Sequence, residues 1–160
     1  KDRAENLMIV DLMRNDIARV CVPGSVKVSG LFELERHAGV QHLVSSITGC
    51  CRPGIEAADV LEAAFPPGSI TGAPKHQAMK VIASLEPARG AWCGSLFLIT
   101  PDGSLSSSVL IRSLFFHRDE TGVWAYRTLA GAGIVADSDP ATEMAETETK
   151  ILAIRRALTG

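Results

Sequence analysis

Residues 131–150 read GAGIVADSDPATEMAETETK and combine a glycine turn with the start of an acidic helix. Gly131 and Gly133 lie one residue apart, which lets the backbone turn sharply and approach a ligand closely. Asp139 followed by Pro140 predicts a helix start, because Asp is a preferred N-cap residue and Pro a preferred first helical residue. The stretch therefore predicts a tight turn that leads directly into a helix.

The apolar pair Ile134 and Val135 predicts the end of a strand, and apolar residues at helical spacing predict a helix over residues 142–158. Glu143 and Glu146 are three residues apart, so they share one face of that helix. Together with the turn they would present two carboxylates and backbone N–H groups to one pocket, where a divalent cation could carry an anionic ligand. Spacing alone favours a solvated acidic face over such a site, because Glu is common near a helix start, where it complements the helix dipole.

Composition and length are typical of one soluble globular domain. The chain has 160 residues, of which 46% are hydrophobic and 21% charged, with a formal net charge of −2. Without a basic run we expect no nucleic-acid partner, and without a long apolar stretch or a signal peptide we expect no membrane span. The cysteines lack the CxxC spacing of a zinc site and do not suit a disulfide framework, so we expect a reducing, cytoplasmic location. They are Cys21, Cys50, Cys51 and Cys93.

The first part of the chain is expected to form a helix followed by strands. Apolar residues spaced by three and four predict a helix over residues 3–17, with Glu5 near its start. Partial alternation of apolar and polar residues predicts strands within residues 25–51. His42 lies between apolar residues there, a setting in which a histidine is more often a hydrogen-bonded core residue than a catalytic one. Residues 56–65 then predict a short amphipathic helix.

The segment GSITGAPK, residues 68–75, is a loop of small residues that opens a helix running to about Leu85. Its exposed N–H groups could cradle an anion at the helix N-terminus. The segment lacks the GxxxxGK[ST] spacing of a P-loop, which argues against a nucleotide phosphate.

Three further strands are expected over residues 92–100, 108–117 and 123–129. Their short connections predict an antiparallel meander, and the whole chain is predicted to have an α+β fold with antiparallel β-sheet layers flanked by helices. Arg112 interrupts an apolar run in the second of these strands, and a buried guanidinium there would need an anionic or carbonyl partner. That partner is either a bound ligand or one of the protein's own carboxylates.

Six segments, in order along the chain, resemble the chorismate-binding enzymes, the family of anthranilate synthase component I, aminodeoxychorismate synthase component I and the isochorismate and salicylate synthases. The segments are KDRAENLMIVDLMRND, VQHLVS, GSITGAPK, AWCGS, VLIRS and GAGIVADSDPATEMAETETK. The resemblance implies that residues 1–160 are the C-terminal portion of the family's catalytic domain, part of its large α/β sandwich. GSITGAPK and Trp92 are most similar to aminodeoxychorismate synthase component I.

The resemblance also implies roles for individual residues. Acidic residues matched to a Mg²⁺ that binds the ring carboxylate of chorismate are Glu5, Glu143 and Glu146. Groups matched to the substrate's other carboxylate are Arg112 and the backbone of Gly131, Ala132 and Gly133. Positions matched to the pocket lining are Thr71, Gly72 and Trp92. His42 matches a histidine near the leaving hydroxyl, with a supporting role in proton transfer, and Lys75 is expected to be structural.

The implied reaction converts chorismate and ammonia to 4-amino-4-deoxychorismate, in 4-aminobenzoate and folate biosynthesis, with ammonia supplied by a glutamine amidotransferase subunit. In aminodeoxychorismate synthases of one type the nucleophile is a lysine in a Pro-Ile-Lys-Gly-Thr segment. Residues 1–160 contain neither this segment nor the family's general-acid Glu. We therefore expect the chain to be inactive alone. Leu105, Ser106 and Ser107 stand where the family usually has Met-Asp-Thr. Two alternatives therefore stay open: anthranilate synthase component I and a non-catalytic module.

Overall fold

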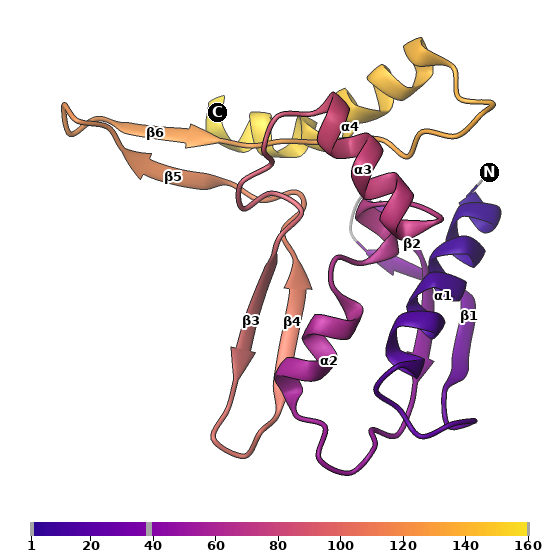
Figure 1. Ribbon diagram of the computed structural model, residues 1–160. Helices are drawn as coiled ribbons and strands as arrows, with labels where there is room; N and C mark the ends of the chain where they lie inside the picture. The colour runs from indigo at the N-terminus through magenta and orange to yellow at the C-terminus, as the bar shows by residue number, and fades with distance from the viewer. Residues whose placement is uncertain (1, 38–39, 160) are drawn as a thin grey trace. The chain divides into compact units, whose positions relative to one another are not determined.

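The computed structural model describes residues 2–37 and 40–159, which fall into two compact units. The first unit comprises Lys1–Arg89 with Phe97–Ser107, and the second comprises Gly90–Leu96 with Ser108–Gly160. Helices and antiparallel strand pairs make up the chain, in agreement with the predicted α+β class (Figure 1). No helix in the described part of the chain is long and apolar enough to cross a membrane.

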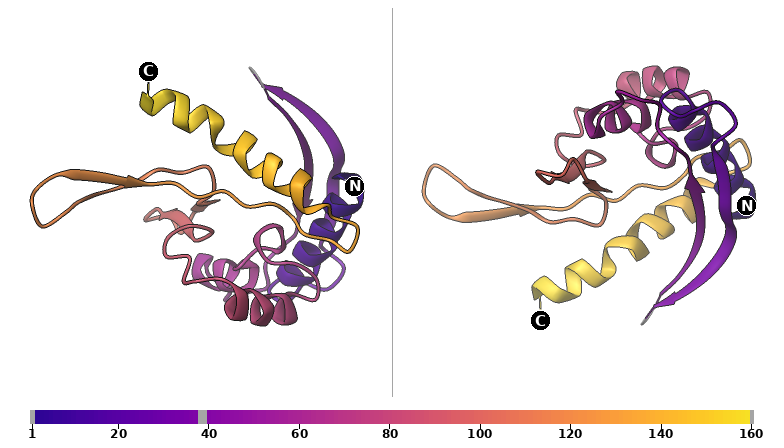
Figure 2. Two further views of the ribbon diagram at one scale, coloured as in Figure 1. Left: turned by 90° about the horizontal axis from the view of Figure 1, so that it is seen from above. Right: turned by 90° about the horizontal axis from the view of Figure 1, so that it is seen from below.

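In the first unit, helix α1, Asp2–Ala18, lies beside an antiparallel ribbon of β1, Lys27–His37, and β2, Val40–Thr48. Both views in Figure 2 show this ribbon curving beside the helix. Its register shifts between Val28 and Glu33, and such irregularities bend and twist a strand pair locally. The helix predicted over residues 3–17 and the strands predicted within residues 25–51 are confirmed.

The hydrophobic core of the first unit forms where the end of α1 meets α2, Ala57–Ala64. Its buried members are Val20, Cys21 and Ala63, and the partly buried residues packed against them are Ile17, Val26, Ile55 and Val60. The chain enters α2 through a hydrogen bond from the Glu56 backbone N–H to the Asp59 carboxylate, 2.8 Å long. This short helix agrees with the one predicted over residues 56–65.

The segment GSITGAPK forms a single 3-10 turn, η1, Gly68–Ile70, and then a loop that opens α3, Lys75–Leu85. Two hairpins follow: β3, Ser95–Ile99, pairs with β4, Leu105–Val109, and β5, Phe115–Arg118, pairs with β6, Trp124–Arg127. Each described strand has one partner, so the strands form separate ribbons rather than the predicted meander. The last element is helix α4, Pro140–Thr159, which begins at Pro140 as predicted.

Two strand predictions are wrong. Residues 108–117 do not form one strand, because β4 ends at Val109 and Arg112 adopts a φ of 51°, in the left-handed region. The Ile111 N–H donates to the Val109 carbonyl at 2.9 Å, a tight turn that takes the backbone out of the ladder. Ile134 and Val135 also lie outside any strand and are exposed. A run of apolar residues indicates a buried segment or a strand, but it gives no sign of a turn that is closed by a backbone hydrogen bond.

Candidate functional site

The start of α4 is fixed by a side-chain cap. The Asp139 Oδ1 accepts hydrogen bonds from the Thr142 backbone N–H at 2.9 Å and from the Thr142 hydroxyl at 2.8 Å. These bonds, the hydroxyl first, hold the pKa of Asp139 below its ordinary value. The predicted N-cap role of Asp139 is therefore confirmed, and it orients the first turn of the helix that carries Glu143 and Glu146.

Asp139→Ala should lower the melting temperature near neutral pH by about 3 °C, the usual size of an N-cap loss in a domain of this length. Because the folded-state pKa is depressed, the cap stabilises the fold above the unfolded-state pKa of about 4 and is lost as pH falls through the folded value. Thermal unfolding followed by circular dichroism between pH 2 and 7 measures this effect. Asp137→Ala is the matched control and should leave the melting temperature unchanged; equal losses in both variants would contradict the cap.

Glu143 lies one turn into α4 and is buried, with 4% of its surface exposed. Its Oε1 accepts a hydrogen bond of 2.6 Å from the Ser138 hydroxyl. Ser138 in turn accepts a 3.0 Å bond from the Val135 N–H, so the loop before the helix holds the carboxylate in one orientation. A buried carboxylate is costly unless it is bonded or paired, which distinguishes Glu143 from the solvated acidic face that the sequence also allowed.

Glu146 is linked to the glycine turn through Lys150. The Lys150 Nζ lies 2.6 Å from the Glu146 Oε1 and donates to the Gly131 carbonyl at 3.0 Å. The indole of Trp92 lies against the same glycine, since a Cβ built on Gly131 would be 3.4 Å from the ring. Three of the predicted site positions therefore meet around one turn, because Trp92 contacts Gly131 directly and Glu146 reaches it through Lys150. Glu143 belongs to the same unit and is bonded to Ser138 instead.

Arg112 does not occupy the buried strand position that the sequence predicted. It is exposed and sits in the turn between β4 and β5. The turn is closed by the Ser113 hydroxyl, which donates to the Ile111 carbonyl at 3.0 Å. An exposed guanidinium on a turn needs no internal partner, so Arg112 is available to an anion, and its role toward a substrate carboxylate stays a prediction.

The loop that carries Thr71 and Gly72 is held on several sides. The Thr71 hydroxyl donates to the Pro67 carbonyl at 3.0 Å, and Arg89 donates to the Ile70 carbonyl at 2.9 Å. Gly72 has a φ of 145°, which few residues other than glycine adopt. Gly68 packs so closely on α1 that an added Cβ would lie 2.6 Å from the Leu12 Cδ1. These contacts hold the loop in place within the first unit.

Lys75, the first residue of α3, forms an ion pair with Asp16 near the end of α1. The Asp16 side chain is 6% exposed and that of Lys75 is 18% exposed. The pair ties the loop before α3 to α1, which agrees with the structural role expected of Lys75.

Glu5 and His42 lie on neighbouring elements of the first unit, α1 and β2, and both are half-buried. Asn6 joins these elements: its Nδ2 donates to the Leu43 carbonyl at 3.1 Å and its Oδ1 accepts from the Ser45 hydroxyl at 2.6 Å. His42 is opposite Glu35 in the register of the ribbon. The metal-binding role of Glu5 and the supporting role of His42 stay predictions.

In the described part of the chain no three His, Cys, Asp or Glu side chains are grouped closely enough to hold a metal ion. Glu5 belongs to the first unit, whereas Glu143 and Glu146 belong to the second. The two glutamates of α4 still fit Mg²⁺, because it is a hard cation commonly held by one or two carboxylates together with several waters. Glu146 would have to exchange Lys150 for the metal, or use its second oxygen.

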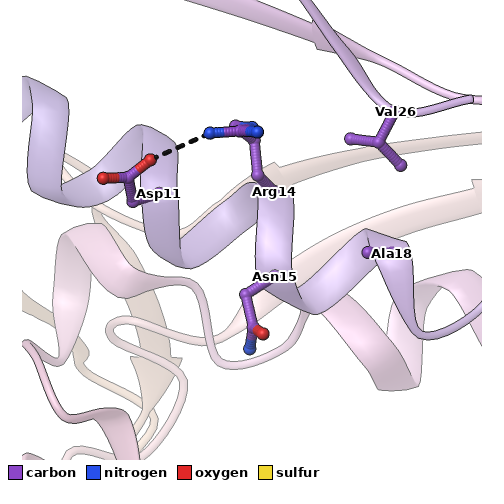
Figure 3. Close-up of a pocket in the computed structure, with 5 residues that line it drawn as sticks. All are labelled: Asp11, Arg14, Asn15, Ala18 and Val26. Atoms are coloured by element: carbon purple, nitrogen blue, oxygen red, sulfur yellow. Dashed lines mark hydrogen bonds and ion pairs between the residues drawn. The ribbon is translucent and has the colours of Figure 1, made fainter. Parts of the chain in front are cut away.

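A surface hollow of about 290 Å³ lies beside the second half of α1. Figure 3 shows its lining residues, Asp11, Arg14, Asn15, Ala18 and Val26. An exposed ion pair of 3.2 Å joins Asp11 and Arg14. None of the predicted site residues lines this hollow, so it is a feature of the surface rather than a substrate pocket.

Sequence reasoning missed three residues that hold the site: Asn6, Ser138 and Lys150. Lys150 had a usable signal, since a lysine four residues after Glu146 on a helix is placed to pair with it. Asn6 had none, because its partners lie 37 and 39 residues away in the chain. Ser138 had none either, because its bond to Glu143 requires the folded loop.

A family model described as chorismate binding enzyme matches residues 1–156. The chain belongs to the chorismate-binding enzyme family. The structure of anthranilate synthase component I from Streptococcus pneumoniae superposes on it with a TM-score of 0.80 at 38% identity, covering 92% of this chain and 33% of that one. The expected fold is therefore confirmed.

Two curated relatives illustrate the range of the family. Aminodeoxychorismate synthase component 1 of Klebsiella aerogenes is 53% identical over 154 residues, covering 94% of this chain and 33% of the relative. Anthranilate synthase component 1 of Saccharolobus solfataricus is 44% identical over 159 residues, covering 99% of this chain and 37% of the relative. The chain spans about a third of the length of the curated relatives it matches.

Proposed function

We propose that this chain is the chorismate- and Mg²⁺-binding portion of an aminodeoxychorismate synthase component I. Its reaction would convert chorismate and ammonia to 4-amino-4-deoxychorismate. The observation that carries this choice is the 53% identity to an aminodeoxychorismate synthase component 1, against 44% to an anthranilate synthase component 1. The motif GSITGAPK and Trp92 support the same choice.

The residues around the glycine turn suit a dianionic substrate. Mg²⁺, held by Glu143 and Glu146, would neutralise one carboxylate of chorismate when bound. The exposed guanidinium of Arg112 would engage the other carboxylate, for which its planar fork is well matched. The buried position of Glu143 and its bond to Ser138 keep one metal ligand preorganised, and the backbone N–H groups near Gly131 would add fixed donors.

The anthranilate synthase reaction is the second candidate, because relatives of that name match the chain over the same length at 44% identity. The two reactions use the same substrate and differ in product. A glutamine amidotransferase subunit would supply ammonia in either case, and the names of the relatives, component 1, are in keeping with such a partner.

Two hybrid enzymes test the proposal. Residues 1–160 replace the matching third of Klebsiella aerogenes aminodeoxychorismate synthase component 1 in one hybrid, and of Streptococcus pneumoniae anthranilate synthase component I in the other. Both are assayed with chorismate, Mg²⁺ and ammonium, and products are separated by chromatography. We expect the kcat/KM of the first hybrid to stay within about tenfold of its parent, and that of the second to fall more than about a hundredfold below its parent. The reason is that the contacts that stabilise one transition state differ from those that stabilise the other.

The opposite ranking would favour the anthranilate reaction. Two folded hybrids that bind chorismate in the presence of Mg²⁺ and form no product would support a non-catalytic module. Adding the cognate amidotransferase subunit with glutamine in place of ammonium tests the partner separately from the chemistry.

A further inference from the structure

Cys21 and Cys51 form an isolated antiparallel bridge, just after α1 and just after β2. Two backbone hydrogen bonds flank the pair: the Val22 N–H donates to the Cys50 carbonyl at 2.8 Å and the Arg52 N–H donates to the Val20 carbonyl at 3.0 Å. This pattern makes the cysteines a non-hydrogen-bonded pair, the closer kind of cross-strand pair, with Cα atoms about 4.5 Å apart. Disulfides span Cα separations of about 4.4–6.8 Å, so the backbone is already placed for one.

The two thiols differ in accessibility. Cys21 is 4% exposed, and burial together with the neighbouring Cys51 thiol raises the pKa of Cys21. Cys51 is exposed. Since the thiolate is the nucleophile in disulfide exchange and needs access to its target, Cys51 is the group that reacts with a reagent from solution and Cys21 the group that follows.

We propose that Cys21 and Cys51 are a thiol pair that forms a reversible cross-strand disulfide by exchange with a low-molecular-weight disulfide. The Cys51 thiolate attacks one sulfur of the reagent, which leaves a mixed disulfide on Cys51 and releases one thiol. Cys21 gives its proton to solvent and attacks the Cys51 sulfur, which forms the internal S–S bond and releases the second thiol. The two cysteines lose two electrons, and the reagent disulfide is reduced to two thiols.

The bond would close a loop that contains both strands of the ribbon and would join the end of α1 to the end of β2. These are the elements that carry Glu5 and His42 and that Asn6 already connects. A cross-link there restricts the unfolded chain while leaving the folded backbone in place. The oxidised protein should therefore resist unfolding more strongly than the reduced protein.

Cys50 provides a matched control. It adjoins Cys51 and is also exposed, but successive residues of an extended strand point to opposite faces. Its backbone is fixed by Ser25, whose hydroxyl accepts from the Cys50 N–H at 3.2 Å and donates to the Cys50 carbonyl at 3.3 Å. Cys93 is buried in the second unit and should not react in the native protein.

The test equilibrates the 160-residue chain with mixtures of reduced and oxidised glutathione, traps free thiols by alkylation and maps disulfides by peptide mass spectrometry. We expect a Cys21–Cys51 disulfide in the wild type and in Cys50→Ser, and none in Cys51→Ser or Cys21→Ser. The equilibrium constant for forming this disulfide should be at least about tenfold larger in the native protein than in concentrated urea. By linkage, a disulfide that stabilises the fold is favoured by the fold to the same extent. The urea midpoint of oxidised Cys50→Ser should rise accordingly.

Three results would overturn the proposal. One is a mixed glutathione disulfide on Cys51 that persists without joining Cys21 in native Cys50→Ser. Another is a dominant Cys50–Cys51 disulfide in the native wild type. The third is an equal equilibrium constant for the Cys21–Cys51 bond in native and unfolded protein, which would show that the fold does not favour the pair.

Discussion

Lys75→Met should lower the free energy of unfolding of the chain by about 3–5 kcal/mol, the cost of leaving a buried charge without its partner. Asp16, the partner, is 5% exposed on α1, so water cannot readily replace the lysine. Methionine keeps most of the volume of the lysine stem, which separates loss of charge from loss of packing. Urea unfolding followed by circular dichroism measures the change.

The double variant Asp16→Asn/Lys75→Met should recover part of the loss, because no unpaired charge then remains in the interior. Arg14→Met is the matched control on the same helix. It breaks the Asp11–Arg14 pair, whose side chains are 65% and 50% exposed, and exposed pairs contribute less than about 1 kcal/mol. A loss from Lys75→Met no larger than that of Arg14→Met would contradict the structural role of the buried pair.

Glu143→Gln should weaken Mg²⁺-dependent chorismate binding by at least about a hundredfold in the aminodeoxychorismate synthase hybrid, and Ser138→Ala by about tenfold. Glu143→Gln would remove the proposed metal ligand, whereas Ser138→Ala would remove only the hydroxyl that orients it, and changes in orienting residues typically cost 10–100-fold in metal affinity. Calorimetric titration of chorismate with and without Mg²⁺ measures both effects.

Glu148→Gln is the matched control for this series. Glu148 is also a glutamate of α4, and it pairs at the surface with Arg155 at 3.0 Å. Its replacement should leave chorismate binding unchanged. Equal affinities for the wild type and Glu143→Gln, with both proteins folded, would remove Glu143 from the metal site while leaving the assignment to the family untouched.

Local sequence signals predicted the parts of this fold that depend on near neighbours. Apolar spacing predicted α1, α2 and α4, and Asp139 with Pro140 located the start of α4 because a cap acts within three residues. The strand assigned to residues 108–117 failed because a backbone turn around Arg112 interrupts it, and no side-chain pattern marks that turn. The predicted meander contains more strand pairs than the structure for a similar reason. Alternation of apolar and polar residues indicates a strand but does not show how many partners it has.

Residues of the candidate site could be predicted only where they fall in a family motif or recur at helical spacing. The spacing of Glu143 and Glu146 placed both on α4, but the burial of Glu143 depends on how the preceding loop folds back through Ser138. The Asp16–Lys75 pair joins residues 59 positions apart, and Lys150 reaches the carbonyl of Gly131 across 19 positions. Such contacts are products of tertiary packing, which one sequence read locally does not contain.

The chain has two tryptophans, and their surroundings differ enough to make one of them an intrinsic optical reporter. Trp92 is half-buried with its indole against Gly131, whereas Trp124 is 62% exposed with the Arg118 guanidinium 5.2 Å from its ring centre. In Trp124→Phe the remaining tryptophan fluorescence would come from Trp92 alone. Any anion that settles on the backbone beside Gly131 would then alter emission intensity and wavelength, without a dye and without turnover.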